Sequence, residues 1–452
     1  MSLDVWQGAE QEFASGLRPI SLFHALEKRG VYIHRAKDNI PRAHLKNGGV
    51  CYVHSNLFEV CTPECRNAFE VVAYDKASEA YARLASWAHD EQTGEQIHIY
   101  KVNLASDPKG EVEHTTVGAH ENYLMERSGY TGKDHLLVPY LVLRQLFCGI
   151  GGFIDGSYMI SPRTIFPQKI YSEVSTDYPI ISLRDEAHAS DRFFRVHIVY
   201  GEGARSEYVT FLKHSITSYI LQAIQKEHIK EVPELLDPIA TGQEISKCLN
   251  GDWIIELTSG KKERAIDYLN TNYLEGIEKV FDAGAPSDHD LFALKEFKWV
   301  LSKLDEGLFE ALASSIEWVT KLVFIEESFT DHFSIEEGLN EASAKRAAAN
   351  QYTAVTDPFF DELSDSLSLR RIVSDDDIEH AFQEPPSRSR GYLRVVLAKH
   401  FRDSIDTMSW SYIKLKKRRS TLNFPFEILD GWTQEAVPMF IAEIESQIRS
   451  DT

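Results

Sequence analysis

The stretch from Gly118 to Met125 most constrains how this chain can fold, because three polar residues stand side by side in it: His120, Glu121 and Asn122. A packed core does not take up such side chains unless other polar groups meet them. We therefore expect this stretch to lie in a fold that encloses a polar site.

Alternating polar and apolar residues predict several strands that join one sheet. The segments with this pattern are residues 4–13, 50–54, 96–102 and 194–200. Side chains two positions apart on a strand lie on the same face, so His197 is expected beside Arg195.

A helix is predicted after Ser206, where apolar residues recur at steps of three and four positions. These residues are Val209, Leu212, Ile216, Ile220 and Ile224. This stripe is expected to cover the back of the sheet, and residues 290–350 are predicted to be largely helical. Ser374 is expected to cap a further helix that begins with three aspartates. Strands followed by helices indicate an α+β fold.

The size and charge of the chain limit its domain organisation and its partners. Its 452 residues, 43% of them hydrophobic, exceed the usual limit of a single core. We expect a large domain over residues 1–383 and a small C-terminal domain over residues 384–452, with the boundary near Pro385 and Pro386. The 48 basic and 69 acidic residues give a formal net charge of −21, which argues against nucleic acid as a partner.

Cysteine usage and hydropathy favour a cytoplasmic protein that does not span a membrane. The five cysteines are an odd number in a long chain, and no secretory signal precedes them, which predicts the reducing cytoplasm. Cys61 and Cys65 lack a second pair at zinc-ligand spacing, so they are expected to be ordinary thiols. Arg144 and Gln145 interrupt the most apolar run, which falls short of the roughly 20 residues that cross a bilayer.

Two groups of polar residues are candidates for a functional site. Glu10 and Glu12 would share one face of a strand, and neighbouring carboxylates repel each other unless a cation lies beside them. Magnesium prefers such oxygens and leaves room for phosphate oxygens, so the pair suits a Mg-nucleotide site. The alternative is two solvated acids on an edge strand.

A second group is expected to line the open face of the sheet. Its members are His120, Glu121, Asn122, Arg184, His188 and His197. Arginine binds carboxylate or phosphate through two parallel hydrogen bonds, and histidine or asparagine can orient the bound group. The alternative for each histidine is a structural position with its hydrogen bonds satisfied. Basic residues between Lys414 and Arg419 are candidates to receive an acidic small protein, although such runs are more often solvated.

Several short motifs, taken in order along the chain, resemble the Pup ligase and depupylase family. They include Gly8–Phe13, Asn47–Gly49 with Tyr52, Thr62–Cys65, Gly118–Met125, Arg184–Ala189 and Trp410. The resemblance implies a glutamine-synthetase-like antiparallel sheet covered by helices, with ATP and Mg2+ as cofactors. It also implies a small acidic protein modifier or peptide, and its target protein, as partners.

The same resemblance assigns individual residues. It implies Mg2+ binding by Glu10, Tyr52 and Glu59, and contact with ATP by Thr62 and Trp410. Around the transferred phosphoryl group, we assign Arg184 and His197 to ATP, and His120, Asn122 and His188 to the substrate. Without the resemblance, we would interpret Tyr52 and Trp410 as core aromatic residues and Thr62 as the first residue of a turn.

The chain departs from the family pattern at the catalytic position itself. The family has a catalytic aspartate two residues after the metal-site tyrosine, where this chain has His54. Other departures are Val50, the pair Leu57 and Phe58, and Ala354. A neutral imidazole can still accept a proton from an attacking amine, so His54 is predicted to be the catalytic base.

Three functions follow from these observations. The preferred one is an ATP-dependent ligase that activates a glutamate carboxylate and joins it to an amine. The second is a depupylase-like amide hydrolase. The short connection from Gly16 to Gly48 favours the ligase, while the spacing from Tyr52 to Glu59 favours the depupylase. The third is an inactive binding or regulatory paralogue, which the changes at Val50, His54 and Ala354 favour.

Overall fold

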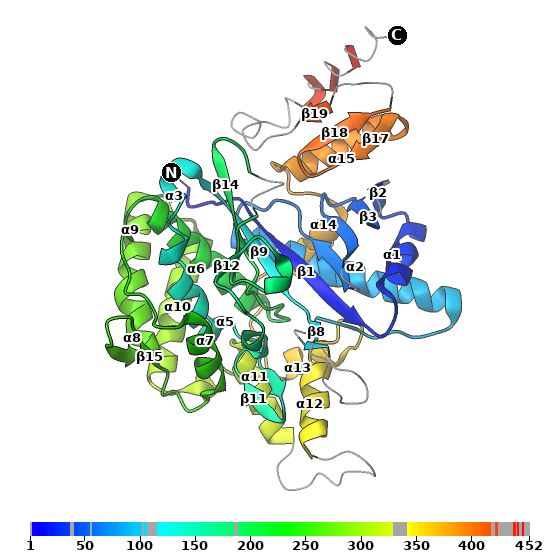
Figure 1. The fold of residues 1–452 in the computed structure, drawn as a ribbon. Helices are drawn as coiled ribbons and strands as arrows, with labels where there is room; N and C mark the ends of the chain where they lie inside the picture. The colour runs from blue at the N-terminus through cyan, green and yellow to red at the C-terminus, as the bar shows by residue number, and fades with distance from the viewer. Residues whose placement is uncertain are drawn as a thin grey trace.

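The chain is built around one ten-stranded sheet, in which β1 lies near the centre (Figure 1). The structure, a computed structural model, describes residues 2–36, 40–54, 57–101, 104–105, 115–184, 189–328, 341–416, 421–423, 437–439, 441–442 and 445–446. The strand order is β12-β13-β14-β9-β1-β5-β4-β3-β2, and β6 pairs with the end of β1. All pairs are antiparallel except β12 with β13.

The strands of the large sheet are β1 Gln7–Ser15, β2 Tyr32–Arg35, β3 Arg42–Leu45, β4 Val50–His54, β5 Leu57–Cys61, β6 Ile99–Tyr100, β9 Ala119–Glu126, β12 Tyr171–Ser172, β13 Ile181–Ser182 and β14 Phe193–Ile198. The predicted strands at 50–54 and 194–200 are therefore confirmed, and the first strand begins at Gln7 rather than Asp4. Within residues 96–101, only Ile99 and Tyr100 form a strand, because this segment pairs with β1 only at Ala14 and Ser15.

Helices cover the back of this sheet, as the stripe after Ser206 predicts. Helix α6 (Glu207–Gln225) begins at Ser206, whose side chain accepts the Val209 N–H. All five stripe residues are buried in the core, and α2 (Ala68–Thr93) packs against both α6 and β1. The burial of these apolar faces supplies the main stabilising free energy of the domain.

The other helices are α1 Pro19–Lys28, α3 Arg127–Tyr130, α4 Val138–Leu143, α5 Gln145–Cys148, α7 Pro238–Lys247, α8 Ala265–Leu269, α9 Glu275–Ala283, α10 Asp288–Asp305, α11 Glu317–Ser328, α12 Glu341–Gln351, α13 Phe359–Ser366, α14 Asp375–Gln383 and α15 Arg390–Phe401. Two-stranded ribbons are formed by β7 Leu104–Ala105 with β8 Thr115–Thr116, β10 Gly152–Ile154 with β11 Ser157–Met159, and β15 Ile254–Glu256 with β16 Lys262–Arg264. The helical prediction for 290–350 is confirmed over the described part of that range.

A separate small sheet follows α15 and contains β17 Ile405–Met408, β18 Tyr412–Leu415 and β19 Thr421–Asn423. Its strands and α15 enclose their own apolar cluster, which includes Leu393, Leu397 and Met408. It lies beside the main sheet in Figure 1, next to β2 and β3. The division into domains at residues 383 and 384 stays a prediction.

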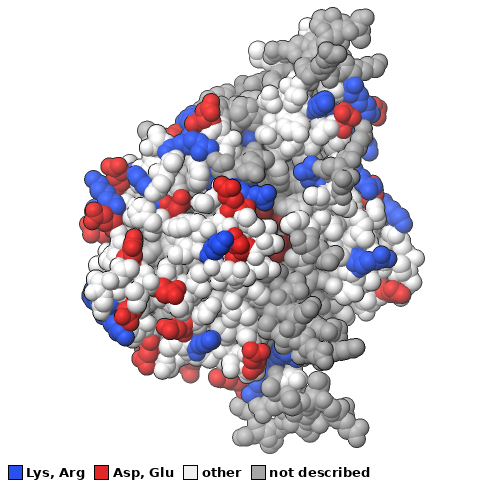
Figure 2. All heavy atoms as spheres, viewed as in Figure 1, with Lys and Arg blue, Asp and Glu red and all other residues white. Residues whose placement is uncertain are grey.

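Three expectations about composition can be compared with the structure. All five cysteines are free thiols. Within the described ranges, none of the helices is both long enough and apolar enough to cross a membrane. Figure 2 shows basic and acidic side chains interspersed on the visible face, so the net charge is not gathered there into one acidic patch.

Ser374 caps α14 and explains the aspartate run that follows it. The Ser374 hydroxyl accepts the Asp377 N–H at 3.1 Å, and the Asp377 carboxylate accepts the Ser374 N–H at 2.8 Å. This reciprocal pair is a capping box, and the acids face the positive end of the helix dipole. The capping prediction is confirmed.

Substitution of Ser374 by alanine is expected to lower the free energy of unfolding by about 1 kcal/mol, because one N-terminal N–H loses its acceptor. Urea denaturation of both proteins measures this difference. Ser366→Ala is the matched control, since Ser366 is an exposed serine at the end of α13 whose hydroxyl only donates to Leu363 O. Equal stability of Ser374→Ala and the unmodified chain would contradict the capping assignment.

Candidate functional site

The register of the sheet brings most of the predicted site residues to one face. Directly paired residues of neighbouring antiparallel strands point to the same side. The pairs are Glu10 with His120, Gly8 with Asn122, His197 with Asn122, Glu12 with Glu59, and Tyr52 with Glu59. This face is the one opposite α2 and α6.

Glu121 is the exception among the polar residues of β9. Its side chain lies on the helical face, is fully buried, and accepts hydrogen bonds from Arg144 at 2.9 Å and from the Tyr123 hydroxyl at 2.8 Å. The expectation that Glu121 lines the open face is wrong, because neighbouring residues of a strand point to opposite faces. Glu121 stabilises the core beneath the site instead.

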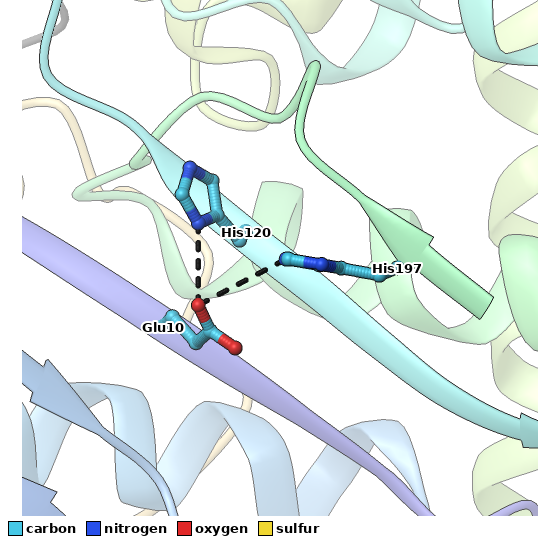
Figure 3. Close-up of side chains that lie close together, drawn as sticks. All are labelled: Glu10, His120 and His197. Carbon is cyan, nitrogen blue, oxygen red and sulfur yellow. Dashed lines mark hydrogen bonds and ion pairs between the residues drawn. The ribbon is translucent and has the colours of Figure 1, made fainter. Parts of the chain in front are cut away.

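Glu10 is the centre of the polar face (Figure 3). His120 Nδ1 lies 3.2 Å from its Oε2, and Asn122 Nδ2 donates to its Oε1 at 3.0 Å. His197 Nε2 lies 3.9 Å from Oε2, and an Arg195 nitrogen lies 3.7 Å from Oε1. Four donors from β9 and β14 therefore surround one carboxylate of β1.

These donors decide the charge of Glu10. Burial alone would raise the pKa of its carboxyl group, but the hydrogen bond from His120, the neighbouring His197 and His120 rings and the Arg195 guanidinium lower the pKa well below its ordinary value. Glu10 is therefore ionised at neutral pH. An ionised carboxylate only accepts hydrogen bonds, so the Nδ1 of His120 carries a proton and donates it to Glu10.

His197 is held as a neutral imidazole with a defined tautomer. Burial and the charge of Arg195 lower its pKa to about 3. An Arg195 N–H donates to His197 Nδ1 at 2.9 Å, as the shared-face prediction expects, so the proton of the neutral ring is on Nε2. Glu10, His120 and His197 lie close enough to hold a metal ion. In this arrangement, however, His197 offers that ion a proton and not a lone pair.

Glu59 and Tyr52 form the second acidic part of the face. The Tyr52 hydroxyl donates to Glu59 Oε1. Burial and the nearby carboxylates of Glu10 and Glu12 raise the pKa of Glu59 well above its ordinary value. Glu12 accepts the Gly118 N–H at 2.6 Å. Such a concentration of carboxylates is what a bound divalent cation would offset, so the donor set fits a hard cation such as Mg2+.

A cleft opens beside Glu10, over the ends of β1, β5 and β9. Among the residues that line it are Trp6, Gly8, Glu10, Thr62, Arg195 and Trp410. Gly8 lies close against Thr62, since a Cβ at Gly8 would lie 3.1 Å from Thr62 Oγ1. The Thr62 hydroxyl is fixed by accepting the Ala9 N–H at 3.0 Å. The structure thus places Thr62 and Trp410, which are far apart in sequence, in one cleft.

Trp410 reaches this cleft because Glu64 ties the C-terminal segment to the sheet. Buried Glu64 accepts hydrogen bonds from Arg390 at 3.1 Å and from Arg394 at 2.8 Å. Arg394 also donates to the Trp410 carbonyl at 2.7 Å and lies 4.8 Å from its ring centroid. Gly48 has φ 81°, and a Cβ there would lie 3.0 Å from Gly391 Cα, so this close approach requires glycine.

The remaining predicted residues lie farther from Glu10 or outside the described chain. His54 is exposed at the end of β4, two positions beyond Tyr52. Arg184 is exposed after β13, and its carbonyl accepts a hydrogen bond from Arg195 at 3.2 Å. His188 and the basic residues 417–419 lie outside the described residues. Lys414 and Lys416 are exposed at the end of β18.

Sequence reasoning missed two parts of this site. Arg195 was expected beside His197 but was not assigned to the site, although its position two residues away was a usable signal. Glu64, Arg390 and Arg394 were not identified, because their contacts join segments more than three hundred positions apart.

An open antiparallel sheet with a carboxylate- and imidazole-lined face, backed by helices, defines the glutamine-synthetase-like class. The predicted α+β fold and this fold class are confirmed. A sequence model of the family described as Pup-ligase protein matches residues 12–414, and the chain belongs to this family.

Known proteins agree with this assignment. The chain is 29% identical over 403 residues to the Pup–protein ligase of Acidimicrobium ferrooxidans, covering 84% of this chain and 86% of that one. It is 25% identical to the Pup–protein ligase of Bifidobacterium longum subsp. infantis, covering 93% and 89%. The solved complex of the prokaryotic ubiquitin-like protein Pup with its ligase PafA shares the fold, with a TM-score of 0.82 at 22% identity over 98% of this chain and 93% of that one. A PafA structure in complex with ADP gives a TM-score of 0.77 at 22% identity, over 95% and 94%.

Proposed function

We propose that this chain is an ATP-dependent carboxylate–amine ligase, which joins a glutamate carboxylate of a small Pup-like modifier to an amine of a target protein. The observation that carries this proposal is membership of the Pup-ligase family over residues 12–414. The cleft beside Glu10 supplies a matching site, because carboxylates and hydrogen-bond donors meet there. Free thiols support the expected reducing cytoplasm as the compartment.

Glu10, Glu59 and Tyr52 are the residues we assign to Mg2+. Bound Mg-ATP would supply the phosphoryl group that activates the carboxylate and the positive charge that offsets these acids. The three side chains come from β1, β5 and β4, which are directly hydrogen-bonded neighbours. Strands hold such groups more rigidly than loops do.

Thr62, Trp410, His197 and Arg184 are assigned to ATP. Thr62 and Trp410 line the same cleft, and the Nε2 of His197 lies 3.9 Å from Glu10 Oε2. We assign His120, Asn122 and His188 to the substrate. The Asn122 Oδ1, which makes no hydrogen bond within the described chain, can accept a hydrogen bond from an amine of the substrate, and His120 lies beside it on the same face.

The proposal is tested with purified chain, Mg-ATP, Pup and a protein that presents lysines. Calorimetry should show saturable Mg-ATP binding, and mass spectrometry should show the Pup-target conjugate only when ATP is present. Release of Pup from a preformed conjugate, without ligation, would favour the depupylase-like hydrolase. Nucleotide binding with neither product would favour the regulatory paralogue.

His54 is the proposed catalytic base. Substitution by alanine is expected to lower the ligation rate by about 10²- to 10⁴-fold while nucleotide affinity stays unchanged, because the attacking amine loses its proton acceptor. His135→Ala, which removes another exposed histidine, is the control. His54→Asp introduces the residue that the family resemblance places there and should retain turnover. Unchanged turnover in His54→Ala would remove His54 from the mechanism.

A further inference from the structure

A second cavity, of about 300 Å³, lies between α2, the start of α6, α13 and the segment that leads into α14. It shares no lining residue with the cleft beside Glu10. Basic residues from separate elements line it, among them Lys76 and Arg83 of α2 and Arg205 just before α6. The function proposed above does not use this cavity.

Arg205 is the most unusual residue in its wall, because only 1% of its surface is exposed and most of its N–H groups are not hydrogen-bonded. One nitrogen donates to the Ala354 carbonyl. Its Nε lies 3.3 Å from a Glu79 oxygen, and Nη2 lies 4.0 Å from Asp361, but neither nitrogen makes a hydrogen bond within the described chain. A guanidinium carries five N–H donors, and the three on Nε and Nη2 of Arg205 make no hydrogen bond within the described chain although these nitrogens are buried.

The buried charges around Arg205 do not balance. Three buried cations, Lys76, Lys101 and Arg205, share two buried carboxylates, Asp75 and Glu79. Burying a charge without a counterion costs free energy. A bound negative charge beside these three cations would therefore be stabilising.

Arg83 adds a second guanidinium to the wall. It lies about two helical turns after Lys76 and therefore on the same side of α2. It lines the cavity, is half-buried, and has neither a hydrogen bond nor an ion pair to any described residue. Two arginines and a lysine thus approach one space from α2 and from the segment before α6.

The acidic residues of the wall do not cancel this charge. Glu207 accepts the N–H groups of Ile372 and Val373 and pairs with Arg371. Asp375 also pairs with Arg371. Asp361 and Asp365 are exposed at the mouth, and Asp361 is the nearer competitor for Arg205.

We propose that this cavity is a binding site for a small phosphate-bearing anion, which Arg205 and Arg83 hold with Lys76 beside them. Guanidinium groups bind phosphate oxygens through paired hydrogen bonds, and several cations around one space suit a doubly charged group better than a single carboxylate. The Phe360 ring, 4.1 Å from the Arg205 guanidinium, forms an apolar wall that supports the arginine plane.

The proposal is tested by calorimetric titration of the full chain with inorganic phosphate, pyrophosphate and succinate. Phosphate or pyrophosphate should bind saturably, and Arg83→Ala should weaken this affinity by about 10- to 100-fold, as the loss of a charged hydrogen bond predicts. Asp361→Asn should tighten binding, because it removes the competing carboxylate. Arg264→Ala, which removes an exposed arginine paired with Asp305, is the matched control and should change nothing.

The variant Arg195→Ala distinguishes phosphate binding in the cleft beside Glu10 from phosphate binding in the second cavity. Phosphate affinity at the second cavity should be unchanged in this variant. The proposal is overturned if the unmodified chain binds no phosphate, if Arg83→Ala binds it as tightly, or if only succinate binds. Ligation activity is a separate readout, so failure of this site would not bear on the proposed ligase function.

Discussion

Replacement of Glu10 by glutamine is expected to reduce ligation by about 10²- to 10³-fold, the usual loss when one charge-stabilising group of an active site is removed. Glutamine keeps the size of the side chain but lacks the negative charge that a divalent cation needs. Its amide nitrogen would also face the N–H donor of either His120 or Asn122, which contact different oxygens of Glu10. Initial rates with Pup and a target protein measure the effect.

The matched control for Glu10 is Glu126→Gln. Glu126 lies on the neighbouring strand β9 but at its exposed end, where it pairs with Arg192. Calorimetry should show that Glu10→Gln binds nucleotide equally with Mg2+ and with a chelator, whereas the control keeps the preference for Mg2+. A Glu10→Gln protein that retains this preference would exclude Glu10 as a cation ligand.

Replacement of Glu64 by alanine is expected to lower the free energy of unfolding by about 3–5 kcal/mol, because it removes the buried carboxylate that two buried guanidinium groups share. Arg390 and Arg394 are each about 1% exposed or less, and no solvent can replace the lost carboxylate easily. Guanidinium chloride denaturation measures this change. Nucleotide affinity should fall as well, since Arg394 positions Trp410 in the cleft.

An exposed ion pair provides the comparison for Glu64. Glu278→Ala removes the partner of Lys298, and both side chains are 44% exposed, so a loss of at most about 1 kcal/mol is expected. If Glu64→Ala is no less stable than Glu278→Ala, Glu64 does not hold the C-terminal segment in place. If stability falls but nucleotide affinity does not, Trp410 lies outside the nucleotide site.

Much of the site was predictable from local patterns. The alternation in 50–54 and 194–200 placed Tyr52 and His197 on strands, and period two placed Arg195 beside His197. The same alternation along a strand, applied to Gly118–Met125, places the Glu121 side chain on the face opposite to those of His120 and Asn122. The expectation that all three polar residues line one face failed because strand alternation was not applied to them.

The sequence by itself determined the strands at 50–54 and 194–200, the apolar stripe of α6 and the cap at Ser374, because each depends on residues close together in the chain. It also determined the family resemblance, because the motifs keep their order along the chain. Only the tertiary structure decided which donors meet Glu10, which tautomer His197 adopts and how Glu64 brings Trp410 to the cleft. The balance of buried charges around Arg205 was decided in the same way. These features depend on strand register and on contacts between distant segments, and neither follows from spacing along the chain.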